Sequence, residues 1–159
     1  LALRRPPWEK VPGDDWIEVE TAAAAVRALG ETPRRVFLAL GRKELGPFEA
    51  APQHFYLVRS VDPVEPPLAV PQAHYIVARG PFGEAGDRAL LETHRIATVV
   101  AKNSGGAATY GKIAAARALG LKVIMLKRPA LPEVEAVTAV DDALRWIDHA
   151  LTLSTARGV

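Results

Sequence analysis

Short, continuous runs of apolar residues recur along the chain, separated by charged or turn-forming segments. Runs without polar alternation are typical of strands that are buried on both faces of a sheet. In the second half of the chain they alternate with helical patterns, which favours a parallel, doubly wound sheet. The sequence therefore predicts an α/β fold with an open, mostly parallel, Rossmann-like sheet of about five strands and helices on both faces. The predicted strands cover residues 35–40, 54–58, 73–78, 97–101 and 122–126.

Four further segments have the composition or the periodicity of helices, at residues 21–30, 83–95, 106–120 and 138–151. The first begins at Thr21, a good N-cap residue, and ends at Gly30, a common stop signal. In the last segment, Leu144, Ile147 and Leu151 recur at helical spacing, so they are expected to form one apolar face.

The start of the chain follows a different pattern. Residues 1–20 are interrupted by prolines and include one short alternating piece, Trp-Ile-Glu-Val-Glu, so we interpret them as an extended arm or linker with room for one strand. Residues 21–159 are expected to form a single Rossmann-like domain. The first residue is Leu1 rather than Met, which suggests that a segment is missing upstream.

Composition narrows the class of protein. Of the 159 residues, 49% are hydrophobic and 24% are charged, as in a soluble globular domain with a hydrophobic core. There is no signal-peptide pattern and no apolar run long enough to cross a bilayer, so no membrane association is expected. The absence of cysteine excludes disulfides and thiolate sites and is consistent with a cytoplasmic enzyme. The net charge is only +2, without a long basic run, so nucleic acid is not an expected partner.

Basic residues follow all five predicted strands. Open parallel sheets bind ligands at the carboxyl ends of their strands. The chain has 20 basic and 18 acidic residues, so an even distribution would place acids there as often as bases. One interpretation is an anion-binding edge for a nucleotide cofactor, a polycarboxylate or both, and the alternative is an ordinary solvated rim. The residues concerned are Arg42 with Lys43, Arg59, Arg79, Lys102, and Lys127 with Arg128.

The histidines fall elsewhere. His54 and His74 precede predicted strands, and His94 ends a helix that leads into a strand, so all three are expected at the amino edge of the sheet. His149 lies on the last predicted helix. None is spaced with a second histidine or a carboxylate as in a metal site, and no Ser-His-Asp arrangement can be assigned. We therefore expect no metal, and the sequence identifies no catalytic residue.

Residues 101–113 contain an incomplete phosphate-binding P-loop. Gly106 to Lys112 follows the spacing Gly-x-x-x-x-Gly-Lys, but the next residue is Ile113, which cannot bind Mg²⁺ as Ser or Thr does. Tyr110 and Lys112 are separated by one residue, not by the three of the short-chain dehydrogenase pair, so they point to different sides of a helix. Neither a nucleoside-triphosphate-dependent transferase nor a short-chain dehydrogenase is therefore favoured.

The same segment can still hold an anion in another way. Its two adjacent glycines let the backbone approach a ligand closely, and the start of a helix offers free N–H groups and a partial positive charge. A lysine and two hydroxyl groups lie nearby. This predicts a cradle for pyrophosphate or carboxylate, although a plain turn is the alternative. The cradle residues are Lys102, Asn103, Ser104, Gly105, Gly106 and Thr109.

Several motifs together resemble a known family. The stretch KNSGGAATYGKIAAARALGLKVIMLKRP is preceded by ARGPF, by FYLVRSVDP and GRKELGPF, and by RRPPW near the start. In this combination the chain resembles the precorrin-6A reductases of cobalamin biosynthesis. The similarity covers nearly the whole chain, and KNSGGAATY is highly specific.

The resemblance implies an NADPH-dependent reductase that delivers a hydride to one double bond of precorrin-6A to give precorrin-6B. Family members are longer and contain two Rossmann-like halves. This chain is therefore expected to be the carboxy-terminal half, with the N-terminal half of the same enzyme as its partner. Because the nicotinamide supplies the hydride, the protein mainly has to hold the two rings face to face.

The resemblance also suggests roles for the predicted anion-binding edge. The cradle residues would bind phosphate or carboxylate groups of the cofactor or of the substrate. Arg42, Arg59 and Arg79 would bind carboxylates of the macrocycle, because arginine binds them in a bidentate manner. Pro81 and Phe82 could form an apolar wall against the macrocycle, although core packing suits Phe82 equally. A non-catalytic sensor of anions or nucleotides with the same fold is the alternative function.

Overall fold

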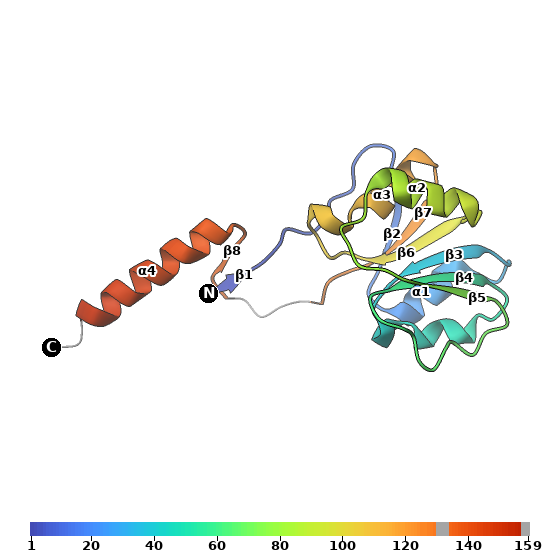
Figure 1. Cartoon of the computed structure of the whole chain (residues 1–159), viewed down its shortest axis with the longest axis horizontal. Coiled ribbons are helices and arrows are strands. Elements are labelled where there is room, and N and C mark those ends of the chain that lie inside the picture. The colour runs from blue at the N-terminus through green and yellow to red at the C-terminus, as the bar shows by residue number, and fades with distance from the viewer. Residues whose placement is uncertain (130–133, 157–159) are drawn as a thin grey trace. The chain divides into compact units, whose positions relative to one another are not determined.

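The computed structural model describes residues 1–129 and 134–156, and the chain divides into two compact units. One unit is Trp8–Pro129, which contains the main sheet (Figure 1). The other combines Leu1–Pro7 with Ala130–Val159. The contacts thus group the chain differently from the expected division into residues 1–20 and 21–159.

The main sheet has six strands, all parallel, in the order β2-β7-β6-β3-β4-β5. The five predicted strands are all present, and the Rossmann-like fold class is confirmed. The sixth strand, β2, comes from the predicted arm, where it pairs along its whole length with β7. The strands are β2 (Asp15–Val19), β3 (Arg35–Ala39), β4 (Phe55–Ser60), β5 (Ala73–Val77), β6 (Thr98–Lys102) and β7 (Lys122–Leu126).

Three α-helices and three 3₁₀ turns connect these strands. Helix α1 begins after Thr21, whose hydroxyl oxygen accepts a hydrogen bond from the backbone N–H of Ala24, and it ends at Gly30, as predicted. The helix expected at residues 106–120 begins later, because a 3₁₀ turn precedes it. The elements are α1 (Ala22–Leu29), α2 (Glu84–Thr93), α3 (Gly111–Ala118), η1 (Arg42–Glu44), η2 (Gly46–Ala50) and η3 (Ala107–Thr109).

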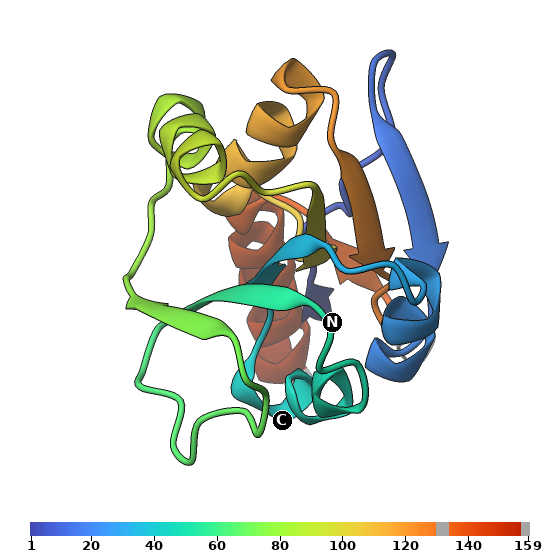
Figure 2. The ribbon, with the colours of Figure 1, turned by 90° about the vertical axis from the view of Figure 1, so that its right-hand side faces the viewer.

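The core consists of two layers, one on each face of the sheet. Within β3, Val36 and Leu38 face the layer covered by α1 and η2, whereas Phe37 faces the layer covered by α2 and α3. Figures 1 and 2 show α2 and α3 on one side of the sheet and α1 on the other. Burial on both faces explains why the strand sequences are apolar at consecutive positions.

The second unit is small. Strand β1 (Ala2–Leu3) pairs in parallel with β8 (Ala136–Val137), and both contact helix α4 (Val140–Ala156). Leu144, Ile147 and Leu151 of the predicted apolar face are 45–60% exposed. Among residues 1–129 and 134–156, no helix is both long and apolar enough to span a bilayer.

The order of the strands determines where loops can form a cavity. From β3 the chain continues to its neighbour β4 and then to β5, and α2 carries it back to β6 on the other side of β3. The loops that follow β3 and β6 therefore leave the sheet toward opposite faces. Such a reversal is the position at which open parallel sheets bind their ligands.

The packing of α3 against the segment before α2 gives a test of this arrangement. A Cβ atom on Gly111 would lie 2.6 Å from the carbonyl oxygen of Phe82 and 2.8 Å from the carbonyl carbon of Gly83. We expect Gly111→Ala to lower the free energy of unfolding by about 1–3 kcal/mol, because the backbones must separate. Gly86→Ala is the control: it lies within α2 with open space around it, and should raise stability by about 0.5–1 kcal/mol. Urea unfolding of both variants measures the difference, and equal stabilities would contradict the close packing.

Candidate functional site

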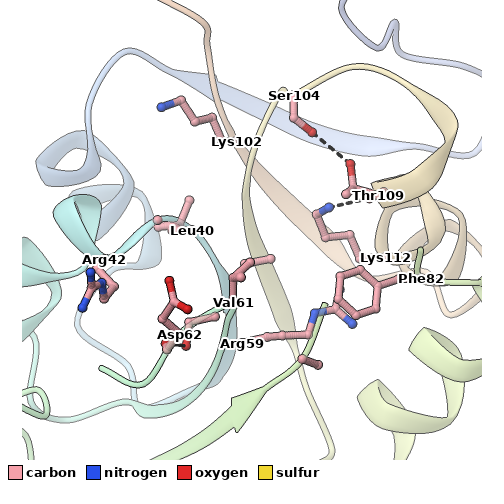
Figure 3. Close-up of a pocket in the computed structure, with 14 residues that line it drawn as sticks. Leu40, Arg42, Arg59, Val61, Asp62, Phe82, Lys102, Ser104, Thr109 and Lys112 are labelled. Carbon is pink, nitrogen blue, oxygen red and sulfur yellow. Dashed lines mark hydrogen bonds between the residues drawn. The ribbon is translucent and has the colours of Figure 1, made fainter. Parts of the chain in front are cut away.

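A cavity of about 470 Å³ opens at the carboxyl edge of the sheet, where the strand order reverses. Its walls come from the ends of β3, β4 and β6, from the loop after β5, and from the start of α3. Figure 3 shows side chains from these separate segments arranged around one space. Six of the residues predicted to bind cofactor or substrate line it, namely Arg42, Arg59, Phe82, Lys102, Ser104 and Thr109.

The rim of the cavity carries two cations and a pair of hydroxyl groups. Lys102 ends β6, and its ammonium group lies 2.8 Å from the Oε1 atom of Glu44. Arg42 begins η1, directly after β3. The hydroxyl oxygens of Ser104 and Thr109 are 3.0 Å apart and hydrogen-bonded across the glycine turn. These groups can donate hydrogen bonds to an anion that enters the cavity.

Asn103 has a structural role that the sequence did not indicate. It is buried, its side-chain oxygen accepts a hydrogen bond from the backbone N–H of Trp8 at 2.8 Å, and its side-chain nitrogen donates to the Trp8 carbonyl at 2.9 Å. The indole Nε1–H of Trp8 donates to the carbonyl of Gly106 at 2.9 Å. The φ angles of Gly105 and Gly106, 64° and 79°, lie in the left-handed region, so the turn itself requires glycine. None of these three cradle residues lines the cavity.

Arg59 differs from its expected position after a strand. It lies within β4, is only 8% exposed, and forms two hydrogen bonds to Asp87 of α2, at 2.5 and 3.2 Å. Its guanidinium group also lies 3.8 Å from the centre of the Phe82 ring. Asp87 is thus the carboxylate that this arginine binds within the chain. Phe82 packs on Arg59 and also lines the cavity.

Three further predicted cations, Arg79, Lys127 and Arg128, do not line the cavity. Arg79 is well exposed and lies 3.6 Å from Asp62. After β7, Lys127 pairs with Glu20 at 2.9 Å, and Arg128 donates to the carbonyl of Asn103 at 2.7 Å. All strand ends share one edge, but among the predicted cations of the described residues only Arg42, Arg59 and Lys102 line the cavity.

The histidines of the sheet unit lie at the opposite, amino edge, as expected. The Nδ1 atom of His54 accepts a hydrogen bond from the backbone N–H of Arg34, and its Nε2 atom lies 3.1 Å from the carbonyl oxygen of Gly30. Burial lowers the pKa of His54. The part of the chain that the structure describes contains no cluster of three His, Asp or Glu residues able to hold a metal ion.

Comparison with known proteins identifies the family of the chain. The profile of the family described as precorrin-6x reductase CbiJ/CobK matches residues 1–148. The chain belongs to this family. It is 56% identical to a precorrin-6A reductase of Sinorhizobium sp over 149 residues, which cover 94% of the chain and 57% of that relative. It is 48% identical to the precorrin-6A reductase of Rhodobacter capsulatus over 159 residues, or 99% of the chain and 62% of the relative.

A solved structure is also similar. The structure named CobK precorrin-6A reductase superposes with a TM-score of 0.88 at 48% sequence identity, covering 93% of this chain and 59% of that one. The chain therefore spans somewhat more than half the length of the precorrin-6x reductases that it matches.

The sequence indicated no ligand-binding role for Lys112, which lines the cavity of this precorrin-6x reductase family member. Lys112 lies in the first turn of α3, lines the cavity, and is only 5% exposed. Its ammonium group donates to the carbonyl oxygen of Thr109 at 2.5 Å and lies 4.9 Å from the centre of the Trp8 ring. Burial, followed by the charge of Arg59, lowers the pKa of Lys112 to about 8, whereas Asp87 opposes this shift. The sequence could have indicated that Lys112 lies near the cavity, because it falls in the first turn of the helix that follows β6.

The lowered pKa of Lys112 predicts how the stability of this family member depends on pH. The unfolded chain binds the lysine proton up to a pKa of 10.5 and the folded chain only up to about 8, so stability rises with pH between these values. Below pH 8 the buried charge costs on the order of 3 kcal/mol. Lys112→Met should therefore raise the free energy of unfolding by about 2 kcal/mol at pH 7, and the gain should vanish near pH 10.5. Urea unfolding at both pH values tests this.

The exposed Lys43 provides a matched control for that measurement. Lys43→Met should change the free energy of unfolding by less than about 0.5 kcal/mol at either pH, because it removes no buried charge. A destabilised Lys112→Met variant at pH 7 would show that the ammonium group is well paired rather than desolvated.

Proposed function

We propose that this chain is part of a cytoplasmic, NADPH-dependent reductase that reduces one double bond of precorrin-6A to precorrin-6B in cobalamin biosynthesis. The observation that carries the proposal is the convergence of four cations on one cavity at the reversal of the strand order. Relatives named precorrin-6A reductase, at 56% and 48% identity, supply the substrate class. The lack of cysteine is consistent with a reducing compartment.

The charges of the cavity suit either proposed ligand. Arg42 and Lys102 stand at the rim, Arg59 and Lys112 are buried in the wall, and Asp62 is the acidic side chain among the described lining residues. Precorrin-6A carries several carboxylates and NADPH carries phosphates, so both are anions that such a cavity attracts.

The glycine turn fits a phosphate or carboxylate group. A side chain at Gly105 or Gly106 would be strained at these positive φ angles, and the turn presents the hydroxyl groups of Ser104 and Thr109 to the cavity. When bound, the reduced nicotinamide supplies the hydride for the reaction. The chain's own residues hold the ligand anions, orient the apolar face near Phe82, and exclude water.

The size of the cavity supports an active site that this chain shares with the N-terminal half of the enzyme. A volume of about 470 Å³ falls within the range typical of a single small-molecule ligand. We therefore propose that the cavity holds one of the two reactants. The other binds against the N-terminal half of the same enzyme, which corresponds to the length of the relatives that this chain does not match.

The small unit supports the same proposal. A two-stranded sheet such as β1–β8 is marginal by itself, and its outer edges can accept further strands. Helix α4 exposes Leu144, Ile147 and Leu151, and Val140 one turn earlier is 61% exposed. Apolar stripes of this kind mark packing surfaces. We propose that the N-terminal half of the reductase covers this face.

An activity assay distinguishes the reductase from a sensor. Precorrin-6A and NADPH are incubated with this chain alone and with a full-length reductase that contains it, and NADPH oxidation is followed spectroscopically. We expect turnover by the full-length protein and little or none by the chain alone, because only one reactant site lies within it. If neither protein shows turnover but either ligand binds, the non-catalytic sensor is the better description.

Lys102 tests the role of the cavity in binding. We expect Lys102→Ala in the full-length reductase to weaken the Kd of precorrin-6A or of NADPH roughly tenfold, because a charge-assisted hydrogen bond is lost. Lys122→Ala, at the amino end of β7, removes a lysine from the opposite edge and should leave both values unchanged. Isothermal titration calorimetry measures both ligands, and unchanged affinities for both would reject the cavity as their site.

A second variant separates two causes of such a loss. Removing Lys102 also leaves the carboxylate of Glu44 without its partner at 2.8 Å, which could repel an anion. The double variant Lys102→Met with Glu44→Gln removes both charges together. Weak binding in the double variant assigns the effect to the missing cation, whereas recovery assigns it to the unpaired Glu44.

A further inference from the structure

We propose that Lys112 is the catalytic residue that donates the proton in the reduction. This inference rests on the proposed function, because reduction of a double bond by a hydride also requires a proton at the neighbouring atom. The sequence left this proton donor unidentified.

The geometry places Lys112 in the wall of the cavity. It enters from the first turn of α3, and Figure 3 shows its ammonium group between Thr109 and Phe82. The carbonyl oxygen of Thr109 holds one N–H at 2.5 Å, and the face of the Trp8 ring lies 4.9 Å away. An ammonium group has three N–H donors, so this anchoring is compatible with donation of another proton into the cavity.

The other charged side chains that line the cavity, within the described residues, are poorly suited to donate a proton. Arg42 and Arg59 keep their protons in any physiological pH range, as arginines do. Lys102 is bound to Glu44, and its side chain is 43% exposed. Asp62 is an exposed carboxylate that lies 3.6 Å from Arg79.

The electrostatic surroundings of Lys112 agree with this assignment. Burial disfavours its charged form most strongly, the positive charge of Arg59 in β4 adds to this, and the carboxylate of Asp87 in α2 opposes both. The resulting pKa of about 8 lies near neutral pH, where a general acid combines a high protonated fraction with ready release of the proton. Trp8 faces the ammonium group without a titrating group of its own.

The reduction adds one hydride and one proton across the double bond. The electron pair and one hydrogen arrive as hydride from the reduced nicotinamide at one atom of the double bond. At the neighbouring atom a new bond to hydrogen forms while one N–H bond of the Lys112 ammonium group breaks. The electrons of that N–H bond remain on the nitrogen, and the neutral amine regains its proton from water.

The test compares Lys112→Arg and Lys112→Met with the wild type in the full-length reductase. Arginine keeps the positive charge but does not release its proton near neutral pH. For Lys112→Arg we expect the Kd of precorrin-6A to stay within about threefold and kcat to fall by about 10²–10⁴-fold. The wild-type kcat should decrease as pH rises above about 8, and this alkaline limb should be absent in the residual activity of the arginine variant.

The outcomes separate the two proposals. If Lys112→Arg retains kcat together with the wild-type pH profile, Lys112 supplies only charge and the inference is overturned. It is equally overturned if the arginine variant loses binding as strongly as kcat. If the wild-type reductase shows no NADPH-dependent reduction, the proposed function itself fails.

A direct titration keeps the inference testable even if a variant does not fold. The pKa of Lys112 is measured by NMR in the 159-residue chain labelled with ¹³C at the lysine ε-carbons, with Lys112→Met used to assign the signal. We expect a titration midpoint near the lowered pKa of about 8, well below the ordinary lysine value of 10.5. A midpoint at the ordinary lysine value of 10.5 would remove the basis for proton donation at neutral pH.

Discussion

The parallel pairing of β3 with β6 is the constraint on which the candidate site depends. Its register sets Leu38 opposite Val100 and Ala39 opposite Ala101, so the two strands end side by side. From there the chain leaves β3 toward η1 on one face of the sheet and leaves β6 toward α3 on the other. A crevice results because no loop can close over both strand ends. The backbone topology thus creates the cavity, and the side chains give it its charge.

The positive charge of the cavity wall is energetically unfavourable where the charged side chains are buried. Arg59 and Lys112 are both buried in the wall, and Asp87 is the acidic group that offsets them from the side of α2. Arg59 is well compensated, since it has two hydrogen bonds to Asp87 and the ring of Phe82 on its face. Lys112 has a carbonyl and an aromatic ring but no carboxylate within ion-pair distance in the described structure. A cation kept in this state is costly to stability, and such costs are concentrated at functional sites. An anionic ligand would offset the same charge.

The sequence predicted the features that depend on local patterns. Burial on both faces leaves continuous apolar runs, so five strands, their direction and the fold class could be inferred. The 3₁₀ turn before α3 could not, because glycine at 105 and 106 permits many conformations. The burial of Lys112 depends on Trp8, and the pairing of Arg59 depends on Asp87, both remote in sequence. The association of α4 with β1 likewise depends on contacts between the two ends of the chain.

Trp8 shows why the remote contacts matter for the chemistry. A turn with two glycines at positive φ has little rigidity of its own, since glycine loses the most conformational entropy on ordering. Here the order is supplied by Trp8, which lies 95 positions before Asn103 and whose backbone N–H and carbonyl are both hydrogen-bonded to the Asn103 side chain. The indole of Trp8 then fixes the carbonyl of Gly106 and lies over the ammonium group of Lys112. A single aromatic side chain therefore positions both the glycine turn and the lysine. Because such positioning must be precise for catalysis, the arm that carries Trp8 is part of the site although it contributes no group that lines the cavity.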